Sequence, residues 1–140
     1  MNTDNYVYEY ATLGCIIKEN HLIEDTNHKE ELFTGQRRLL YRAMKELHAE
    51  KKPIDMVTLI TKNMKVDFGG VSTIQECQNR SYVKKYESYL KIAREEYTKR
   101  EKIGMLNQAL QEDWDIERVT SELDRLVSHE VNDRKESANT

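Results

Sequence analysis

The sequence predicts an all-α protein, a small multi-helix globular head followed by a long antiparallel helical hairpin. Two observations predict helices throughout. The chain contains one proline and five glycines in 140 residues, and hardly any segment alternates apolar and polar residues as a strand does. A third observation predicts the hairpin: residues 81–111 contain one glycine and no proline, which predicts a helix of roughly 45 Å, longer than a small head requires.

The first helix is predicted at residues 6–18, where apolar side chains recur every three or four positions. These positions are Tyr6, Tyr10, Leu13 and Ile17. Gly14 lies inside this helix, where a glycine costs about 1 kcal/mol relative to alanine. We therefore expect another helix to cross closely at Gly14. A short helical turn is predicted at 21–26.

The second helix is predicted at residues 36–50 and ends at the segment KKPID. Its apolar stripe consists of Leu39, Leu40, Ala43, Met44 and Leu47, with Arg37 off the stripe. Pro53 cannot continue the helix, and Asp55 is suited to cap the next one. The segment is therefore predicted to form a corner, followed by a short helix with Val57, Leu59 and Ile60 as its apolar members.

Gly69 and Gly70 predict a break, and a short helix is predicted after it at 71–77. The long helix that follows carries two apolar stripes. The first stripe, predicted to pack on the head, is Tyr82, Tyr86, Leu90, Ala93 and Tyr97. The second, Ile103, Leu106 and Leu110, lies about 130° away around the helix and is predicted to pack on the helix that follows.

That following helix is predicted to begin at Asp115, with its own stripe of Ile116, Val119, Leu123 and Leu126. Two long striped helices joined by a short loop predict an antiparallel hairpin. The stripes cover each other on one side only, and exposed apolar helix surface is usually an interaction site. The predicted organisation is a head at 1–80, a long helix and hairpin at 81–130, and a tail or linker beginning at 131–140.

Charge and composition exclude several classes of function. The net charge is −3, from 22 Lys and Arg against 25 Asp and Glu, which disfavours a dedicated nucleic-acid binder. One rival stays open, a small nucleic-acid-binding protein using basic residues and tyrosines between 84 and 102. The sequence shows no secretory signal and no membrane span, so we expect a cytoplasmic protein with Cys15 and Cys77 as reduced core residues.

The sequence lacks the patterns that catalysis would require. It contains no GxxxxGK[ST] phosphate loop, no GxSxG elbow and no HExxH or HxxxH pair. The four histidines are interpreted as surface residues rather than zinc ligands. We therefore expect no catalytic residue, no cofactor and no metal in these residues.

Four segments in this order resemble the N-terminal domain of the replicative DNA helicases of the DnaB family, across about residues 6–127. The segments are EYATLGCIIKEN, LFTGQRRLLYRAMKELHAEKKPIDMVTLITKN, FGGVSTIQEC and YVKKYESYLKIAREEYTKRE. The resemblance implies a helical head and hairpin, with hairpins pairing between subunits into a collar of three dimers on the hexameric motor. It also implies docking of primase in the primosome and, in some members, of a helicase loader.

Carried onto this sequence, the self-association residues would be Tyr97, Ile103, Leu106, Leu110, Ile116, Val119, Leu123 and Leu126. The ATP-driven motor of such helicases is a separate RecA-like domain. Because residues 131–140 resemble the start of a linker, the favoured interpretation is an excised interaction domain. A free-standing phage or mobile-element relative that binds and modulates a host helicase or primase remains the alternative.

Overall fold

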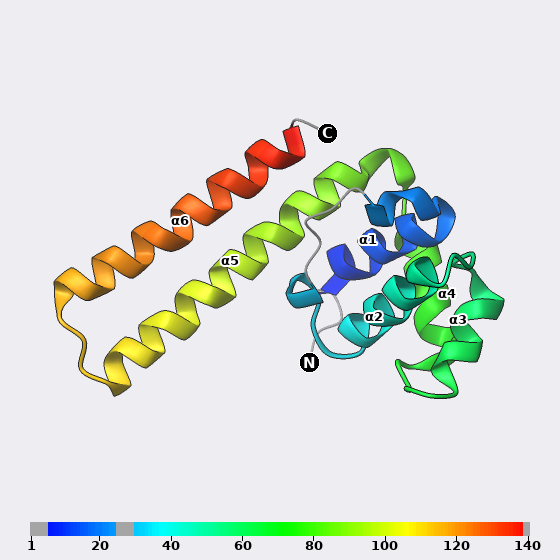
Figure 1. The fold of residues 1–140 in the computed structure, drawn as a ribbon, viewed down its shortest axis with the longest axis horizontal. Helices are drawn as coiled ribbons and strands as arrows, with labels where there is room; N and C mark the ends of the chain where they lie inside the picture. Colours follow the sequence, from blue (N-terminus) through cyan, green and yellow to red (C-terminus); the bar gives the residue numbers. More distant parts are fainter. Residues whose placement is uncertain (1–5, 25–29, 139–140) are drawn as a thin grey trace. The chain divides into compact units, whose positions relative to one another are not determined.

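The computed structural model describes residues 6–24 and 30–138, with side chains described as far as Ser128. Helices are the only regular secondary structure in this part of the chain, which confirms the all-α prediction. The α-helices are α1 (Val7–Lys18), α2 (Gly35–Ala49), α3 (Met56–Asn63), α4 (Gly70–Arg80), α5 (Tyr86–Gln111) and α6 (Ile116–Ala138) (Figure 1). Short 3₁₀ helices are η2 (Asn20–Glu24), η3 (Glu30–Leu32) and η4 (Val83–Lys85).

The chain divides into two compact units, Met1–Ala93 and Arg94–Thr140, called here the head and the hairpin. Helix α5 begins in the head and continues into the hairpin. The predicted turn at 21–26 corresponds to η2, and its last two residues lie outside the described part. The predicted tail is helical as far as Ala138.

The core of the head is centred on the packing of α1 against α4. Leu13, Ile16 and Ile74 are fully buried there. A Cβ atom added to Gly14 would collide with the backbone carbonyl of Cys77. This contact confirms the close helix crossing predicted at Gly14, because only a residue without a side chain permits it.

The corner between α2 and α3 forms as the segment KKPID predicts. The amide of Lys52 donates to the carbonyl of Leu47 at 2.9 Å, and Lys51 has a left-handed φ of 59°, which closes α2. Asp55 accepts a hydrogen bond from the Thr58 amide at 2.9 Å, while the Thr58 hydroxyl accepts one from the Asp55 amide at 3.0 Å. This reciprocal cap begins α3.

Asn20, the first residue of η2, links the corner to α1, because its side chain also donates to the α1 carbonyls of Ile16 at 2.9 Å and Ile17 at 3.2 Å. Its side chain accepts a hydrogen bond from the Ile54 amide at 2.9 Å and donates one to the Ile54 carbonyl at 2.9 Å. Ile54 itself is buried. The direction in which α3 leaves α2 is therefore set by a contact with a residue far away in the sequence.

In the head, two residues predicted in apolar stripes are instead exposed. Tyr82 is 70% exposed because it precedes the helix in extended backbone, so the helical periodicity that grouped it with Tyr86 and Leu90 does not apply. Val57 is 75% exposed because only one face of the short helix α3 meets the core, and Leu59 occupies that face. Of the other members of the first stripe of the long helix, Tyr86, Leu90 and Ala93 are buried as predicted, whereas Tyr97 is half-buried and belongs to the second unit.

A buried ion pair joins α1 to the start of α2. Glu9 is fully buried and accepts hydrogen bonds from the Thr34 amide at 2.6 Å, the Thr34 hydroxyl at 2.9 Å and Arg37 Nε at 3.3 Å. The Arg37 guanidinium also lies 3.9 Å from the centre of the Tyr6 ring. The prediction that Arg37 lies off the buried face is wrong, because this carboxylate and this ring draw it inward.

Among the described residues, no helix combines the length and the apolar character that a bilayer crossing needs.

Candidate functional site

The hairpin turns between α5 and α6 through a short capped loop. The Trp114 amide donates to the Ala109 carbonyl at 3.0 Å, and Asp113 has a left-handed φ of 55°, which closes α5. Asp115 then accepts a hydrogen bond from the Arg118 amide at 2.8 Å. This contact confirms the predicted N-cap of α6 and places the two helices antiparallel (Figure 1).

Within the hairpin, a flexible and a small side chain of α5 are buried, and the flexible one, Met105, lines the same hollow as Leu126 of α6. Met105 and Ala109 are buried on α5, and Leu126 is buried on α6. Val119 and Leu123 are half-buried, at the spacing that keeps them on the same face as Leu126. These five residues form the seam of the hairpin.

A second apolar surface on the hairpin faces away from this seam. Ile103 is 50% exposed, Leu106 42% and Leu110 82%. At about 100° per residue, these three positions lie roughly 110° around α5 from Met105 and Ala109. Ile116, at the start of α6, is 80% exposed. We call Ile103, Leu106, Leu110 and Ile116 the outer stripe.

The structure therefore corrects one part of the sequence prediction. Ile103, Leu106 and Leu110 were expected to cover α6, yet they are exposed. The positions that do so are Met105 and Ala109. The physical reason is that two helices approach closely where a side chain is small. Helical periodicity identifies which positions are apolar, but it does not show which of them lie at that close approach. On α6 the expectation holds for Val119, Leu123 and Leu126, although not for Ile116.

Tyr97, the remaining predicted self-association residue, is half-buried, with the guanidinium of Arg100 at 5.9 Å from its ring centre. It does not belong to the outer stripe. At about 100° per residue it lies roughly 120° from Ile103 around α5.

Sequence reasoning also missed Trp114, which caps the end of the hairpin. The Arg118 guanidinium lies 3.8 Å from the centre of its ring. Trp114 lines a hollow together with Gly104 and Gln108 of α5 and Glu122 of α6. The sequence does contain a signal, since Trp114 is the single tryptophan of the chain and rings of this size usually bury much of their surface.

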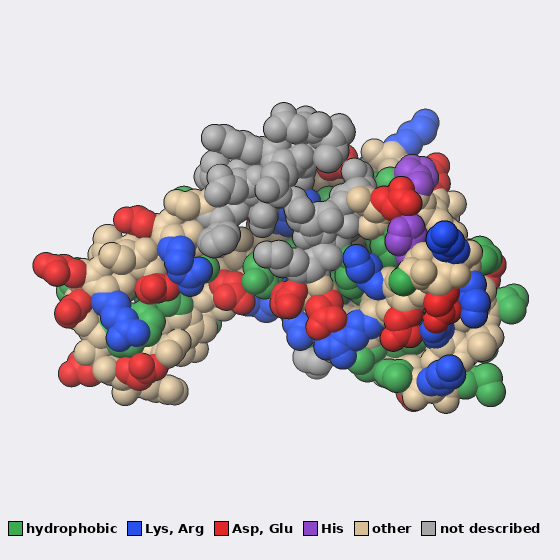
Figure 2. Space-filling model, viewed as in Figure 1, with side chains coloured by type: hydrophobic (Ala, Val, Ile, Leu, Met, Phe, Trp, Pro, Cys, Tyr) green, Lys and Arg blue, Asp and Glu red, His purple; other side chains and the backbone are tan. Residues whose placement is uncertain are grey.

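The tyrosines near the basic residues, which base stacking would require to be exposed, lie in different environments. Tyr86 is buried, and its hydroxyl donates to the Leu22 carbonyl at 3.3 Å, so this ring cannot stack on a base. Tyr82 is exposed, with Lys85 Nζ at 6.0 Å from its ring centre. On the face seen in Figure 2, acidic and basic side chains are interspersed, which is unlike the continuous basic surface that phosphate binding favours.

A metal centre has no candidate within the described residues, since no three His, Cys, Asp or Glu side chains gather there. The two cysteines lie in the core of the head. Burial raises the pKa of Cys15 to about 11 and that of Cys77 to about 12, so both thiols are protonated near neutral pH. Protonated thiols are poor nucleophiles and poor metal ligands.

Comparison with known families gives one informative result. A family model described as the DnaB-like helicase N terminal domain matches residues 1–95. The match covers the head and the first part of α5. A comparison with curated proteins gives no match.

Proposed function

The family match spans residues 1–95 of 140, so the chain belongs to the DnaB-like helicase N-terminal domain family. We propose that its hairpin pairs copies of the domain within a replicative helicase. The N-terminal domain of this family is non-catalytic and takes part in oligomerisation and protein contacts. The finer proposal is that the outer stripe is the surface through which two copies meet, as in a collar built from dimers.

The observation that carries the proposal is the exposure of the outer stripe. Leu110 and Ile116 are each at least 80% exposed, on either side of the hairpin turn. Burying one such side chain fully is worth about 1.5–3 kcal/mol, so a partner surface that covers several of them gains enough to hold a specific dimer.

The test is a pair of charge substitutions at exposed positions of the stripe. Replacing both Leu106 and Leu110 by Asp should leave the seam intact, because neither residue is buried. On self-association the double variant should lose two buried leucines and gain two desolvated carboxylates. We expect its dimer dissociation constant to rise by about a hundredfold or more, measured by light scattering across a concentration series.

Val57→Asp is the control, since Val57, at 75% exposed, lies between Leu106 and Leu110 in exposure but belongs to the head. This variant should self-associate as the wild type does. If the Leu106 and Leu110 double variant keeps the wild-type size at every concentration, the outer stripe is not the pairing surface. Leu123 is unsuited to this test because it lies in the seam, where an Asp would disturb the hairpin itself.

Docking of primase and of a helicase loader is a further part of the proposal, and the family membership supports it. The direct test is co-sedimentation of the chain with a primase and, separately, with a loader. Binding of host helicase or primase by a chain encoded without a motor domain would favour the free-standing alternative. Single-stranded DNA binding that weakens steeply with salt would favour the nucleic-acid alternative.

A further inference from the structure

One side of α5 carries a row of side chains that repeats with coiled-coil spacing. The row, whose members are four, three, four, three and four residues apart, is Ile92, Glu96, Lys99, Ile103, Leu106 and Leu110. At about 100° per residue these positions fall within a sector of roughly 80° around the helix. Alternating spacings of three and four residues are the pattern through which helices pair in coiled coils.

The apolar members of this row are in contact with water. Ile103, Leu106 and Leu110 belong to the outer stripe, and Ile92 is 41% exposed. Ile92 precedes Ile103 by about three turns of the same continuous helix. The row therefore extends the outer stripe along α5 in the N-terminal direction.

Two charged residues interrupt the row. Glu96 is half-buried and Lys99 is exposed, and neither makes an ion pair among the described residues. A charged side chain within an apolar contact between helices costs free energy unless an opposite charge meets it. A helix that pairs with α5 through this row must therefore supply a cation beside Glu96 and a carboxylate beside Lys99.

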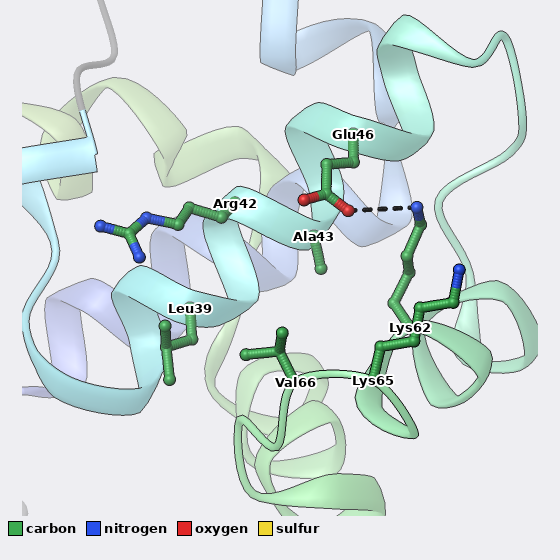
Figure 3. A pocket seen from close by; sticks show the side chains of 7 residues that line it. All are labelled: Leu39, Arg42, Ala43, Glu46, Lys62, Lys65 and Val66. Atoms are coloured by element: carbon green, nitrogen blue, oxygen red, sulfur yellow. Dashed lines mark hydrogen bonds and ion pairs between the residues drawn. The ribbon is translucent and has the colours of Figure 1, made fainter.

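The charged residues around a hollow of the head differ in this respect. Figure 3 shows that hollow between α2 and the turn that follows α3, with the ion pair between Glu46 and Lys62 beside it. Lys62 also binds Glu50, and Arg42 binds Glu30. Because these charges already have partners within the head, they do not call for a charged partner as Glu96 and Lys99 do.

A second copy of α5 supplies both charges in one register. In an antiparallel pair whose two-fold axis passes between the charged positions, Glu96 of each copy lies opposite Lys99 of the other. Each step toward the N-terminus on one helix is then a step toward the C-terminus on the other, so Ile92 lies opposite Ile103. Each ion pair is flanked by a pair of isoleucines, and the row is complementary to itself.

Other arrangements leave the two charges without partners. In a parallel pair in register, Glu96 would face Glu96 and Lys99 would face Lys99, so like charges would meet. An antiparallel pair shifted by one heptad would place Glu96 opposite Leu106 and Lys99 opposite Ile103, so each charge would be buried against an apolar side chain. The charges therefore select both the direction and the register of pairing.

We propose that two copies of the chain pair through α5 in this antiparallel register, with Glu96 of each copy bound to Lys99 of the other. The proposal rests on the self-association through the outer stripe proposed above. It adds the direction of the two helices, their register and the ion pairs that determine both.

Charge reversal in the full chain tests the register. Lys99→Glu leaves only carboxylates at the two pairing positions, and Glu96→Lys leaves only ammonium groups. Each variant should raise the dimer dissociation constant by about tenfold or more, because like charges then face each other. The double variant with both substitutions exchanges the two charges and should recover the wild-type constant within about threefold. Light scattering across a concentration series measures all four proteins.

Mixing the two single variants gives a sharper result. A Lys99→Glu copy offers carboxylates wherever a Glu96→Lys copy offers ammonium groups. The mixture should therefore form heterodimers at concentrations where each variant alone is monomeric. Glu87→Lys is the matched control, because Glu87 is exposed on the same helix about 140° from the row, and it should pair as the wild type does.

Disulfide trapping tests the direction. Copies with Ile92→Cys should cross-link to copies with Ile103→Cys under mild oxidation, and neither variant should cross-link to itself. The native thiols of Cys15 and Cys77 are buried and do not compete. If each variant cross-links to itself instead, the helices are parallel and the proposal is overturned.

The outcomes separate this register from the self-association itself. If the Leu106 and Leu110 double variant dissociates while Lys99→Glu and Glu96→Lys keep the wild-type constant, the outer stripe pairs copies but the register is wrong. If the wild-type chain is monomeric at every concentration, the pairing through the hairpin and this register are overturned together.

Discussion

At the scale of single residues, two glycines in helix interiors have opposite surroundings. A side chain at Gly14 would collide with the backbone of α4, whereas a Cβ at Gly104 would meet no atom within 4 Å. Gly14→Ala should therefore lower the free energy of unfolding by about 1–3 kcal/mol, because two packed helices must separate. Gly104→Ala should raise it by up to about 1 kcal/mol, because alanine is the better helix former.

Urea unfolding followed by circular dichroism measures both effects. Equal changes in the two variants would contradict the assignment of Gly14 to a close crossing. If Gly104→Ala stabilises the monomer but weakens self-association, the open space beside Gly104 is occupied by the partner copy in the dimer.

The two cysteines give a residue-scale prediction with a definite pH dependence. With burial raising the pKa of Cys15 to about 11 and of Cys77 to about 12, the thiolate fraction near pH 8 is about one in a thousand or less. Alkylation by iodoacetamide should be at least about a hundredfold slower in the native chain than in concentrated urea. Above the unfolded thiol pKa of about 8.5 the unfolded state loses protons first, so stability should fall as pH rises.

Mass spectrometry of the alkylated chain over time provides the measurement. Both cysteines are fully buried, and Cys77, whose thiol has the higher pKa, should be the slower of the two. Alkylation of either cysteine at the rate of the unfolded chain would show that its thiol is not buried as described.

At the scale of elements, the caps decide where helices begin. Asp55 and Asp115 each accept a hydrogen bond from an amide in the first turn of the following helix. Replacing either by Ala should cost about 0.5–2 kcal/mol of stability, since an amide loses its partner. Asp55→Ala should destabilise the head, whereas Asp115→Ala should affect the hairpin.

Differential scanning calorimetry combined with the fluorescence of Trp114 separates these two effects. Asp55→Asn and Asp115→Asn are the matched controls, because asparagine keeps the capping oxygen and should recover most of the loss. An alanine variant as stable as its asparagine counterpart would contradict the capping role.

The same local signals explain how much of the fold the sequence could predict. Pro53 and Asp55 predict the corner, Gly69 and Gly70 the break before α4, and Asp115 the start of α6, because each acts through its own backbone or the next turn. The start of α5 was predicted five residues too early, since η4 and the extended residues before it contain no breaker.

What the sequence could not predict depends on contacts between distant residues. Arg37 looks like a surface residue until Glu9, 28 positions earlier, is brought beside it. Likewise, periodicity identifies that Leu106 and Met105 are both apolar, but not which of them faces α6. Which of them faces α6 depends on how closely the two helices approach. Small side chains such as Ala109 permit that close approach.

At the scale of the whole molecule, the two units differ in the kind of apolar surface they expose. The head surrounds a continuous core, and the large apolar residues it exposes among the described residues are Val57, Met64, Val66, Val71, Tyr82 and Ile92. The hairpin has a narrow seam and leaves the outer stripe in water. Of the two units, the hairpin should therefore gain more stability from pairing with a second copy.

The chain carries separate reporters for its two units, which allows this coupling to be measured. Its single tryptophan, Trp114, lies in the hairpin, and both cysteines lie in the head. As protein concentration rises, the urea midpoint reported by Trp114 fluorescence should increase, because pairing stabilises the folded hairpin. At a hundredfold excess over the dissociation constant this stabilisation is about 2.7 kcal/mol.

The urea midpoint at which the cysteines become exposed should depend less on protein concentration than the midpoint reported by Trp114 fluorescence. The reason is that the outer stripe belongs to the hairpin, whereas the cysteines lie in the head. In the Leu106 and Leu110 double variant the concentration dependence should disappear from both signals, while the midpoint for the head stays where it was at low concentration. Two midpoints that coincide and do not move over the whole concentration range would mean that the outer stripe stabilises no partner, and self-association through the hairpin would have to be abandoned.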